Sequence, residues 1–301
     1  MKKIFFLAAL ALTVMSCTNN ADEFLTPEAA QPEPTTVTLT FTPYQMEAMT
    51  RAGVECSSVL PTRKRAATRA AVADFANKLD LWLFDGDTPL QSVQQESTQP
   101  GFATLSLTLD KRKTYTLIAV AHKSSAGHAT LQDGIISWPN DKISQTFFYT
   151  HTFTPADVTT LDCQMTRIVG QFRLETTDAL PAEAATATIA VAETFTRWST
   201  TVNSGTAPAD RTVTFSTLGT AADGTLSLSV YIISTADAPT PHAITVTFLT
   251  ADGQPLQQRT FPDVPIRNGY RTTLRGNFFI DAPFTSTFTV DDWQDYDVTE
   301  F

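Results

Sequence analysis

Four histidines are the first residues in this 301-residue sequence whose type suits catalysis or metal binding. His122 and His128 stand six positions apart with no carboxylate at metal-ligand spacing, and His151 and His242 are isolated. This arrangement matches no zinc motif, because zinc sites place their ligands at short recurring spacings. We therefore expect the four histidines to lie on the surface or in turns, and we expect no metal ion and no other cofactor.

The acidic segments are weak candidates for a catalytic site. Asp85-Gly86-Asp87 lacks the other ligands of a calcium loop, so a hairpin turn is the better interpretation. Paired carboxylates in the final segment "DDWQDYDVTEF" have the chemistry for proton transfer, but carboxylates at a chain terminus are more often solvated. The sequence also has no glycine-rich phosphate loop, no nucleophile elbow and no Cys-x-x-Cys. We therefore expect a protein that is not an enzyme.

Cys17 is the residue for which the sequence predicts a specific chemical modification. The apolar run from Ile4 to Ser16 reaches only about 20 Å as a helix, while a bilayer core needs ~30 Å. A secretory signal peptide at residues 1–16 therefore fits better than a membrane span. The segment Val14-Met15-Ser16-Cys17 resembles the bacterial lipobox, which implies cleavage before Cys17 and lipidation of its sulfur, with acyl chains such as palmitate. The alternative is an ordinary signal peptide with a chance cysteine.

The composition favours a sheet protein outside the cytoplasm. Hydrophobic residues make up 42% of the chain, and the abundant Thr, Val, Leu and Phe suit pleated strands. The net charge of -10 disfavours nucleic acid as a partner. Cys56 and Cys163 are the two cysteines besides Cys17, and their spacing leaves open whether they pair or remain buried free thiols.

The strand pattern predicts an all-β protein with two tandem β-sandwich domains. Residues 17–35 are polar and Pro-rich, which predicts a flexible tether after a lipidated Cys17. The alternating segment "TTVTLTFT" then predicts a half-buried strand. About seven short strands follow in each half, which places the N-terminal sandwich at 36–162 and the C-terminal sandwich at 163–301.

Turn signals join several of these strands. Asp223-Gly224 and Asp252-Gly253 are typical of tight hairpins. The segment "ATLSLTLDKRKTYTLIAVAH" also predicts a hairpin, with its polar tip at Asp110 to Lys113.

Five segments together resemble a known family. They are "PYQMEAMTRA", "LDLWLFDGD", "YTLIAVAHK", "CQMTRIVGQFRLETTD" and "VPIRNGYRTTLRGNFF". Their order and spacing resemble those of the FimB/Mfa2-like fimbrial lipoproteins of Bacteroidota, in the fimbrillin superfamily, over most of residues 36–290. The resemblance implies two transthyretin-like sandwiches, a lipid anchor in the outer membrane and a surface-exposed place in a fimbria. The implied partners are other fimbrial subunits and, for an adhesive subunit, a receptor on a host or bacterial surface.

The same resemblance implies an assembly mechanism. In the stalk subunits of this family, an Arg-specific protease removes the first strand, and an extended segment of the next subunit fills the vacated groove. Here Arg65 and Arg69 follow the strand "TTVTLTFT" and are the candidate cleavage sites. Retention of the lipid indicates a base subunit, whereas cleavage indicates a stalk or tip subunit. The simpler alternative is that this basic run is a solvated loop.

The end of the chain is the other candidate for strand exchange. "FTSTFTVDDW" carries Phe284, Phe288 and Val290 in strand fashion. This segment is either the last strand of its own sandwich or a donor strand for a neighbouring subunit.

A second class of function competes with the fimbrial role. The protein would then be a surface lipoprotein that binds a glycan or a host protein.

Overall fold

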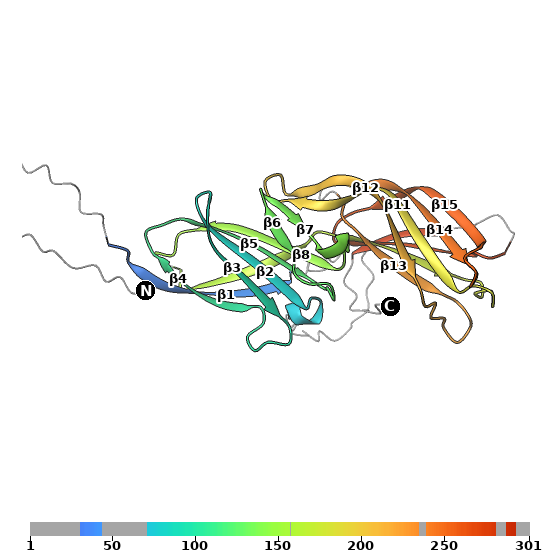
Figure 1. Ribbon diagram of the computed structural model, residues 1–301, viewed down its shortest axis with the longest axis horizontal. Helices are drawn as coiled ribbons and strands as arrows, with labels where there is room; N and C mark the ends of the chain where they lie inside the picture. Colours follow the sequence, from blue (N-terminus) through green and yellow to red (C-terminus); the bar gives the residue numbers. More distant parts are fainter. Residues whose placement is uncertain (1–30, 44–70, 157, 235–238, 281–286, 293–301) are drawn as a thin grey trace, which may run out of the picture. The chain divides into compact units, whose positions relative to one another are not determined.

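The computed structural model describes residues 31–43, 71–156, 158–234, 239–280 and 287–292 (Figure 1). The described residues from Glu33 onward form one compact unit. Cys17, Cys56, Arg65, Arg69 and Phe284 lie outside the described residues. Within the described part, no helix is long and apolar enough to cross a membrane.

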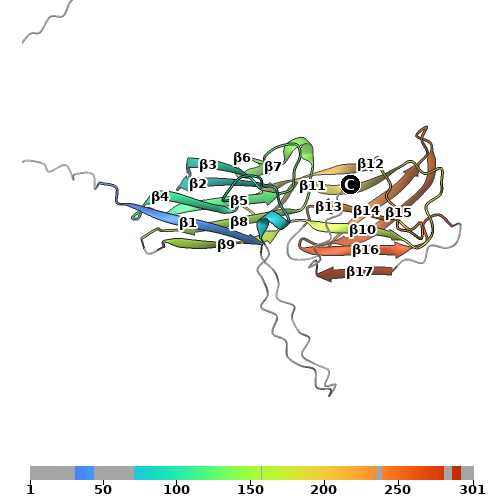
Figure 2. The same ribbon diagram turned by 90° about the horizontal axis from the view of Figure 1, so that it is seen from below.

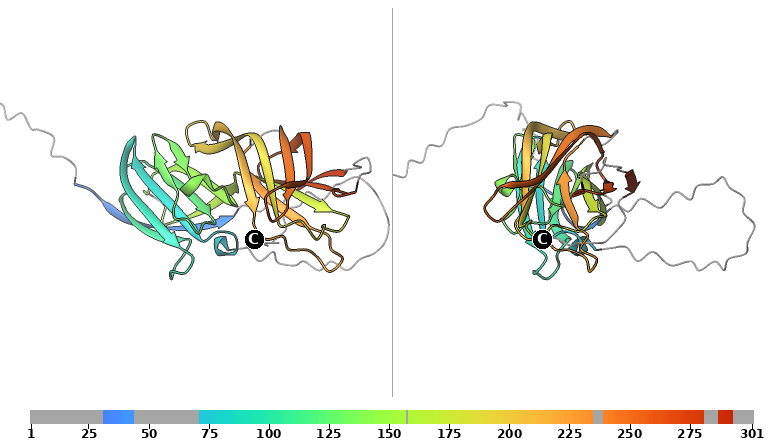
Figure 3. Two further views of the ribbon diagram at one scale, coloured as in Figure 1. Left: turned by 45° about the vertical axis from the view of Figure 1, so that its right-hand side comes forward. Right: turned by 90° about the vertical axis from the view of Figure 1, so that its right-hand side faces the viewer.

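The first sheet has seven strands in the order β3-β2-β5-β8-β9-β1-β4. Their bounds are β1 (Pro34–Pro43), β2 (Lys78–Asp85), β3 (Thr88–Glu96), β4 (Thr104–Asp110), β5 (Tyr115–His122), β8 (Thr146–Phe153) and β9 (Thr160–Arg167). β8 and β9 pair through only two positions, Phe147 with Arg167 and Phe148 with Thr166. The sheet therefore folds at this corner, and β9-β1-β4 packs over β3-β2-β5-β8 as the second layer of a sandwich (Figure 3).

Alternate side chains along each strand point inward and fill the core between these layers. Val37, Leu39 and Phe41 of β1 are at most 2% exposed and join one cluster with leucines of β2, β4 and β5. The threonines between them point to the other face, as expected from the two-residue period of a strand. Phe41 also meets Tyr149 of β8 edge to face, with 6.4 Å between the ring centroids. The strand predicted from "TTVTLTFT" is confirmed.

The second half of the chain repeats the sandwich arrangement with two further sheets. One has the order β13-β10-β16-β17, and β10, β16 and β17 lie side by side in Figure 2. Its strands are β10 (Gly170–Thr176), β13 (Ser227–Ile232), β16 (Tyr270–Gly276) and β17 (Thr287–Asp292). The other sheet has the order β15-β14-β11-β7-β6, and β12 also pairs with β11. Its strands are β6 (Thr130–Gln132), β7 (Ile135–Ser137), β11 (Thr186–Ser199), β12 (Ser204–Phe215), β14 (Thr240–Leu249) and β15 (Pro255–Ile266).

The two halves are joined by shared strands and a shared core. The hairpin β6-β7 comes from the first half of the chain, yet β7 pairs with β11 through Ser137 and Arg197. A third apolar cluster combines residues of both halves, including Trp138 and Trp198. Two short 3-10 helices, Val72–Asp74 and Pro139–Asp141, complete the described elements. The all-β fold class is confirmed, while the division into domains at 162/163 stays a prediction.

Of the two predicted Asp-Gly hairpins, the one at Asp252-Gly253 joins the paired strands β14 and β15. The turn at Asp223-Gly224 is flanked only by an isolated bridge between Thr220 and Leu226, because β12 and β13 pair with other strands. Gly86 between β2 and β3 has φ +59°, and Gly253 between β14 and β15 has φ +80°, a region in which glycine carries no side-chain penalty.

The hairpin predicted for the segment with its tip at 110–113 is wrong. β4 pairs with β1, whereas β5 pairs with β2 and β8 in the other layer. The polar tip marks a turn correctly, but the chain crosses between layers there.

Candidate functional site: a bracketed strand and a cationic groove

β1 is an interior strand although it stands first in the fold. It pairs antiparallel with β4 from Pro34 to Thr40 and parallel with β9 from Thr38 to Pro43. The Thr38 N–H donates to the Thr159 carbonyl over 2.9 Å, and the Phe41 N–H donates to the Ala103 carbonyl over the same distance. Both edges of β1 are thus satisfied by the rest of the chain.

A polar clamp holds the start of β1. The Asp110 carboxylate accepts the Glu33 N–H at 3.3 Å, and the Lys111 N–H donates to the Glu33 carbonyl at 2.9 Å. Asp110 also accepts from the backbone and the guanidinium of Arg112, at 3.1 and 3.2 Å. These hydrogen bonds from Arg112 lower the pKa of Asp110 to about 2.

β17 occupies the opposite kind of position. Among the described residues it is an edge strand and pairs with β16 alone, with Phe288 opposite Leu274 and Val290 opposite Thr272. Of the predicted donor residues, Phe288 and Val290 therefore lie in a strand of their own sheet. The donor role toward a neighbouring subunit stays a prediction.

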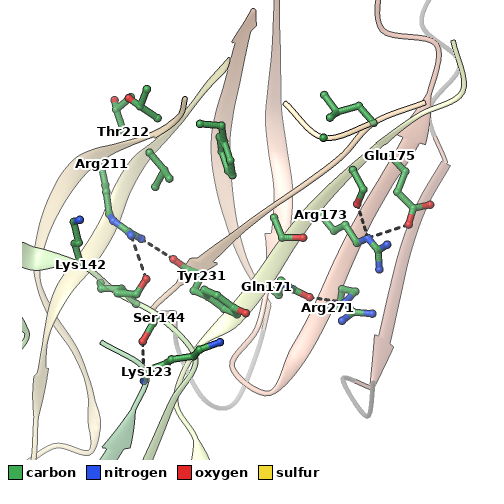
Figure 4. Close-up of a pocket in the computed structure, with 18 of the residues that line it drawn as sticks. Lys123, Lys142, Ser144, Gln171, Arg173, Glu175, Arg211, Thr212, Tyr231 and Arg271 are labelled. Carbon is green, nitrogen blue, oxygen red and sulfur yellow. Dashed lines mark hydrogen bonds and ion pairs between the residues drawn. The ribbon is translucent and has the colours of Figure 1, made fainter. Parts of the chain in front are cut away.

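The outer face of the four-stranded sheet forms the floor of a groove. Along β10, Phe172 and Leu174 point into the core, so the alternate residues Gln171, Arg173 and Glu175 face outward. The same alternation places polar residues of β13 and β16 beside them, because these strands pair with β10 in register. The groove above this face has a volume of about 1510 Å³. Figure 4 shows these side chains from three strands converging on one space.

Arg211 of β12 forms one wall of the groove and ties separate segments together. Its guanidinium donates to the Tyr231 carbonyl at 2.7 Å and to the Ile143 carbonyl at 3.2 Å (Figure 4). Burial lowers the pKa of Arg211 to about 10, against the opposing effect of Asp141. The side chain is therefore a cation at neutral pH. It links the segment around Ile143 to the strands of the second half.

A buried carboxylate helps to position residues 123–129, where the Lys123 N–H donates to the Ser144 hydroxyl at 3.2 Å. Asp80 of β2 is completely buried and accepts the Ala129 N–H at 2.9 Å. Its two oxygens lie 3.1 Å from His122 Nε2 and 2.7 Å from His128 Nδ1. Nearby, Asn77 holds Ser124 by two hydrogen bonds, of 2.8 and 3.1 Å. These contacts fix residues 123–129, whose first part lines the groove.

The expectation for the histidines is therefore partly wrong. His151 is exposed as predicted, but His122 is fully buried and His242 is 4% exposed. His122 is buried because Asp80 supplies a partner within the fold, and no spacing rule reveals that partner. Within the described residues, no group of His, Cys, Asp and Glu is arranged to hold a metal ion.

Cys163 is a buried free thiol in β9. Burial raises the pKa of Cys163 to about 12, with a further contribution from Asp162, although its hydrogen bond with Tyr149 opposes the rise. The thiol is therefore protonated and packs as a small apolar side chain, together with Met165, in the first core. Its candidate partner Cys56 lies outside the described residues.

The comparison with known families gives one assignment. A family of unknown function, DUF6562, matches residues 27–298. The chain belongs to this family. No curated protein sequence matches this DUF6562 chain.

Solved structures share the fold of this DUF6562 chain. A candidate adhesin from Bacteroides thetaiotaomicron has a TM-score of 0.55 and 13% identity, over 88% of this chain and 98% of that one. A candidate polysaccharide-binding protein from the same species has a TM-score of 0.53 and 11% identity, over 86% and 98%. The fimbrial anchor protein Mfa2 from Porphyromonas gingivalis has a lower TM-score of 0.47 and 12% identity, over 86% and 98%. The predicted resemblance to this group of Bacteroidota proteins is confirmed at the level of the fold.

The groove of this DUF6562 chain was not predicted from its sequence. Its floor residues lie in "GQFRLET" and "YRTTLRG", where the alternation marks a polar face but not what covers that face. Asp80 gave a local signal, because a carboxylate between Leu79 and Leu81 in an apolar strand is typical of a buried, hydrogen-bonded group.

Proposed function

We propose that this chain is a non-enzymatic structural or adhesive subunit of a cell-surface fimbria, most simply a base subunit anchored in the outer membrane through lipid on Cys17. The proposal is supported by the fold shared with a candidate adhesin and by the lipobox-like sequence before Cys17. The position of β1 is the single observation that carries the assembly mechanism.

The pairing of β1 on both sides supports assembly by strand addition. Removal of β1 would leave the facing edges of β4 and β9 unpaired and would empty the sites of Val37, Leu39 and Phe41. A foreign strand with the same alternation satisfies both needs at once, because its main chain completes the sheet and its side chains fill the sites. Other fimbrial subunits are the proposed source of that strand.

The fate of the N-terminus separates two versions of the proposal. A base subunit keeps Cys17, the tether and β1, and it then offers β17 or the following residues to its neighbour. A stalk or tip subunit is cut after Arg65 or Arg69, loses β1 together with the lipid, and receives a strand there. The alternative role of a surface lipoprotein that binds a glycan or a host protein stays a prediction.

Metabolic labelling tests the anchor. Cells that express the chain are grown with an alkyne analogue of palmitate, and the outer membrane and the soluble periplasm are compared. We expect label on the wild-type chain in the outer membrane and none on Cys17→Ser. An unlabelled wild-type chain in the soluble periplasm would contradict the proposal.

A further inference from the structure

The groove carries an excess of positive charge in a chain whose net charge is -10. Six cations line it: Lys123, Lys142, Arg173, Arg211, Arg271 and Arg275. Four carboxylates line it: Asp141, Glu175, Asp210 and Asp223. A local excess of cations attracts anions to that place even on an acidic protein.

The carboxylates of the groove already have protein partners. Glu175 binds Arg173 at 3.0 Å, Asp141 binds Arg197 outside the groove, Asp210 accepts the Glu193 N–H at 3.0 Å, and Asp223 accepts the Thr225 hydroxyl at 2.6 Å. Glu175 and Asp141 are each paired with an arginine, whereas Asp210 and Asp223 bind neutral groups and keep their charge. Six cations against four carboxylates still leave the groove with a net excess of two positive charges.

Three of the cations have no such partner among the described residues. Arg211 donates to two carbonyl oxygens, which carry no net charge. Lys142 and Arg275 are exposed and form no ion pair within the described part of the chain. Arg211 and Lys142 lie on one side of the groove (Figure 4). Arg275 comes from β16 in the sheet that forms the floor, opposite Glu175 of β10, so a bound anion can be contacted from two sides.

The remaining lining is rich in hydroxyl groups. Serine and threonine side chains alternate with the cations, among them Ser124, Ser125, Ser144, Thr176, Ser227 and Ser229. The ring of Tyr231 lies between Arg211 and Gln171 (Figure 4). Hydroxyl groups exchange hydrogen bonds with the hydroxyls of a sugar, and an aromatic ring offers an apolar face for the sugar ring. The volume of about 1510 Å³ exceeds that of pockets for one small ligand, so several linked units fit.

We propose that this groove binds an acidic oligosaccharide, with carboxylates of the sugar contacting Arg211, Lys142 and Arg275. An acidic peptide is the competing ligand, because clusters of arginine also bind acidic motifs. The hydroxyl-rich lining and the ring of Tyr231 favour the sugar. Arginine is suited to carboxylates, since its planar guanidinium donates two parallel hydrogen bonds. The proposal is independent of fimbrial assembly, because binding is a property of the isolated chain.

Oligogalacturonate and its methyl ester form a matched pair of probes. Their sugar backbones are the same, and only the acid binds through charge. We expect the purified full-length chain to bind oligogalacturonate at least tenfold more tightly than the ester in isothermal titration calorimetry at low salt. We also expect the affinity to fall as salt increases. Equal affinity for the two probes, or binding of neither, would overturn the proposal.

Two double variants locate the site. Lys142→Gln with Arg275→Gln removes two exposed groove cations, and we expect at least a tenfold loss of affinity for oligogalacturonate. Lys111→Gln with Lys113→Gln makes the same change in net charge at the tip of the β4-β5 connection, and we expect less than a twofold change. Equal losses in both variants would mean nonspecific attraction and would overturn the proposal. A glutamate decamer that binds the wild-type groove more tightly than the sugar would also overturn it, in favour of an acidic peptide.

Discussion

β1 and β17 stand near opposite ends of the chain and hold opposite positions in their sheets. β1 pairs on both sides and buries Val37, Leu39 and Phe41, while β17, within the described part of the chain, pairs with β16 alone at a sheet edge. An interior strand cannot leave without opening two edges, whereas an edge strand can separate after losing one. The comparison therefore indicates that β1 creates a receiving site when it is removed and that β17 is the better placed of the two for exchange in an intact chain.

Removal of β1 should have the largest effect. A chain beginning at Ala70 lacks β1, so we expect it to lose cooperative unfolding or to aggregate through the open edges of β4 and β9. A synthetic peptide of residues 33–43 should bind this chain and restore a cooperative transition in circular dichroism. A scrambled peptide of the same composition is the control. If the truncated chain alone unfolds like the full chain, β1 is not an integral strand.

Truncation of a buried side chain of β1 should have the next largest effect on stability, because it leaves a cavity in the core. Leu39 is fully buried in the first core, so Leu39→Ala should lower the free energy of unfolding by about 2–5 kcal/mol. Leu90 of β3 is 50% exposed, and Leu90→Ala should change this free energy by less than about 0.5 kcal/mol. Urea unfolding measures both. Similar losses for the two variants would contradict the central position of β1.

Truncation at the other end should cost less stability. We expect a chain without residues 287–301, which lacks β17 with Phe288 and Val290, to remain folded, with a loss of unfolding free energy smaller than that of Leu39→Ala, because β17 is a strand at one edge of the described sheet. If this segment is a donor, the truncated chain also loses binding to its partner subunit in a pull-down from cell envelopes. Global unfolding of the truncated chain would show instead that the segment is integral to its sandwich.

The smallest effect concerns the clamp at the start of β1. The pKa of Asp110 is lowered from 3.8 to about 2 by hydrogen bonds from Arg112, so the carboxylate stabilises the folded state above pH 4. This contribution is lost as the pH falls through 2, when the folded form also takes up the proton. The urea midpoints of wild type and Asp110→Asn should therefore differ between pH 5 and 7 and converge near pH 2. A difference that persists at pH 2 would mean that the charge of Asp110 is not its cause.

Local patterns in the sequence predicted the strands better than their partners. The alternation of Val37, Leu39 and Phe41 is a property of a few adjacent residues, and it correctly predicted β1. The β4-β5 hairpin failed because the polar tip at 110–113 specifies a turn, while the pairing of β4 with β1 depends on residues about 70 positions away in the chain. Glycine turns succeeded where a positive φ was needed, as at Gly253.

The groove could not be predicted from the sequence for the same reason, because it depends on which distant strands pair. Its floor comes from three strands that are distant in the chain, and Arg211 comes from a fourth. Each segment alone predicts a strand with one polar face exposed to solvent. Only the parallel pairing of β10 with β16, and the hydrogen bonds of Arg211 to Ile143 and Tyr231, bring their charges together.

The intact mass of the chain in purified fimbriae tests the central claim most directly. The proposal predicts that fimbriae isolated from the cells that make this protein contain the chain starting at Cys17, with the mass of a diacylglyceryl group and acyl chain added. A mature form starting at Ala66 or Ala70 would replace the base subunit with a stalk or tip subunit. Absence of the chain from fimbriae, together with an unmodified Cys17, would contradict the account.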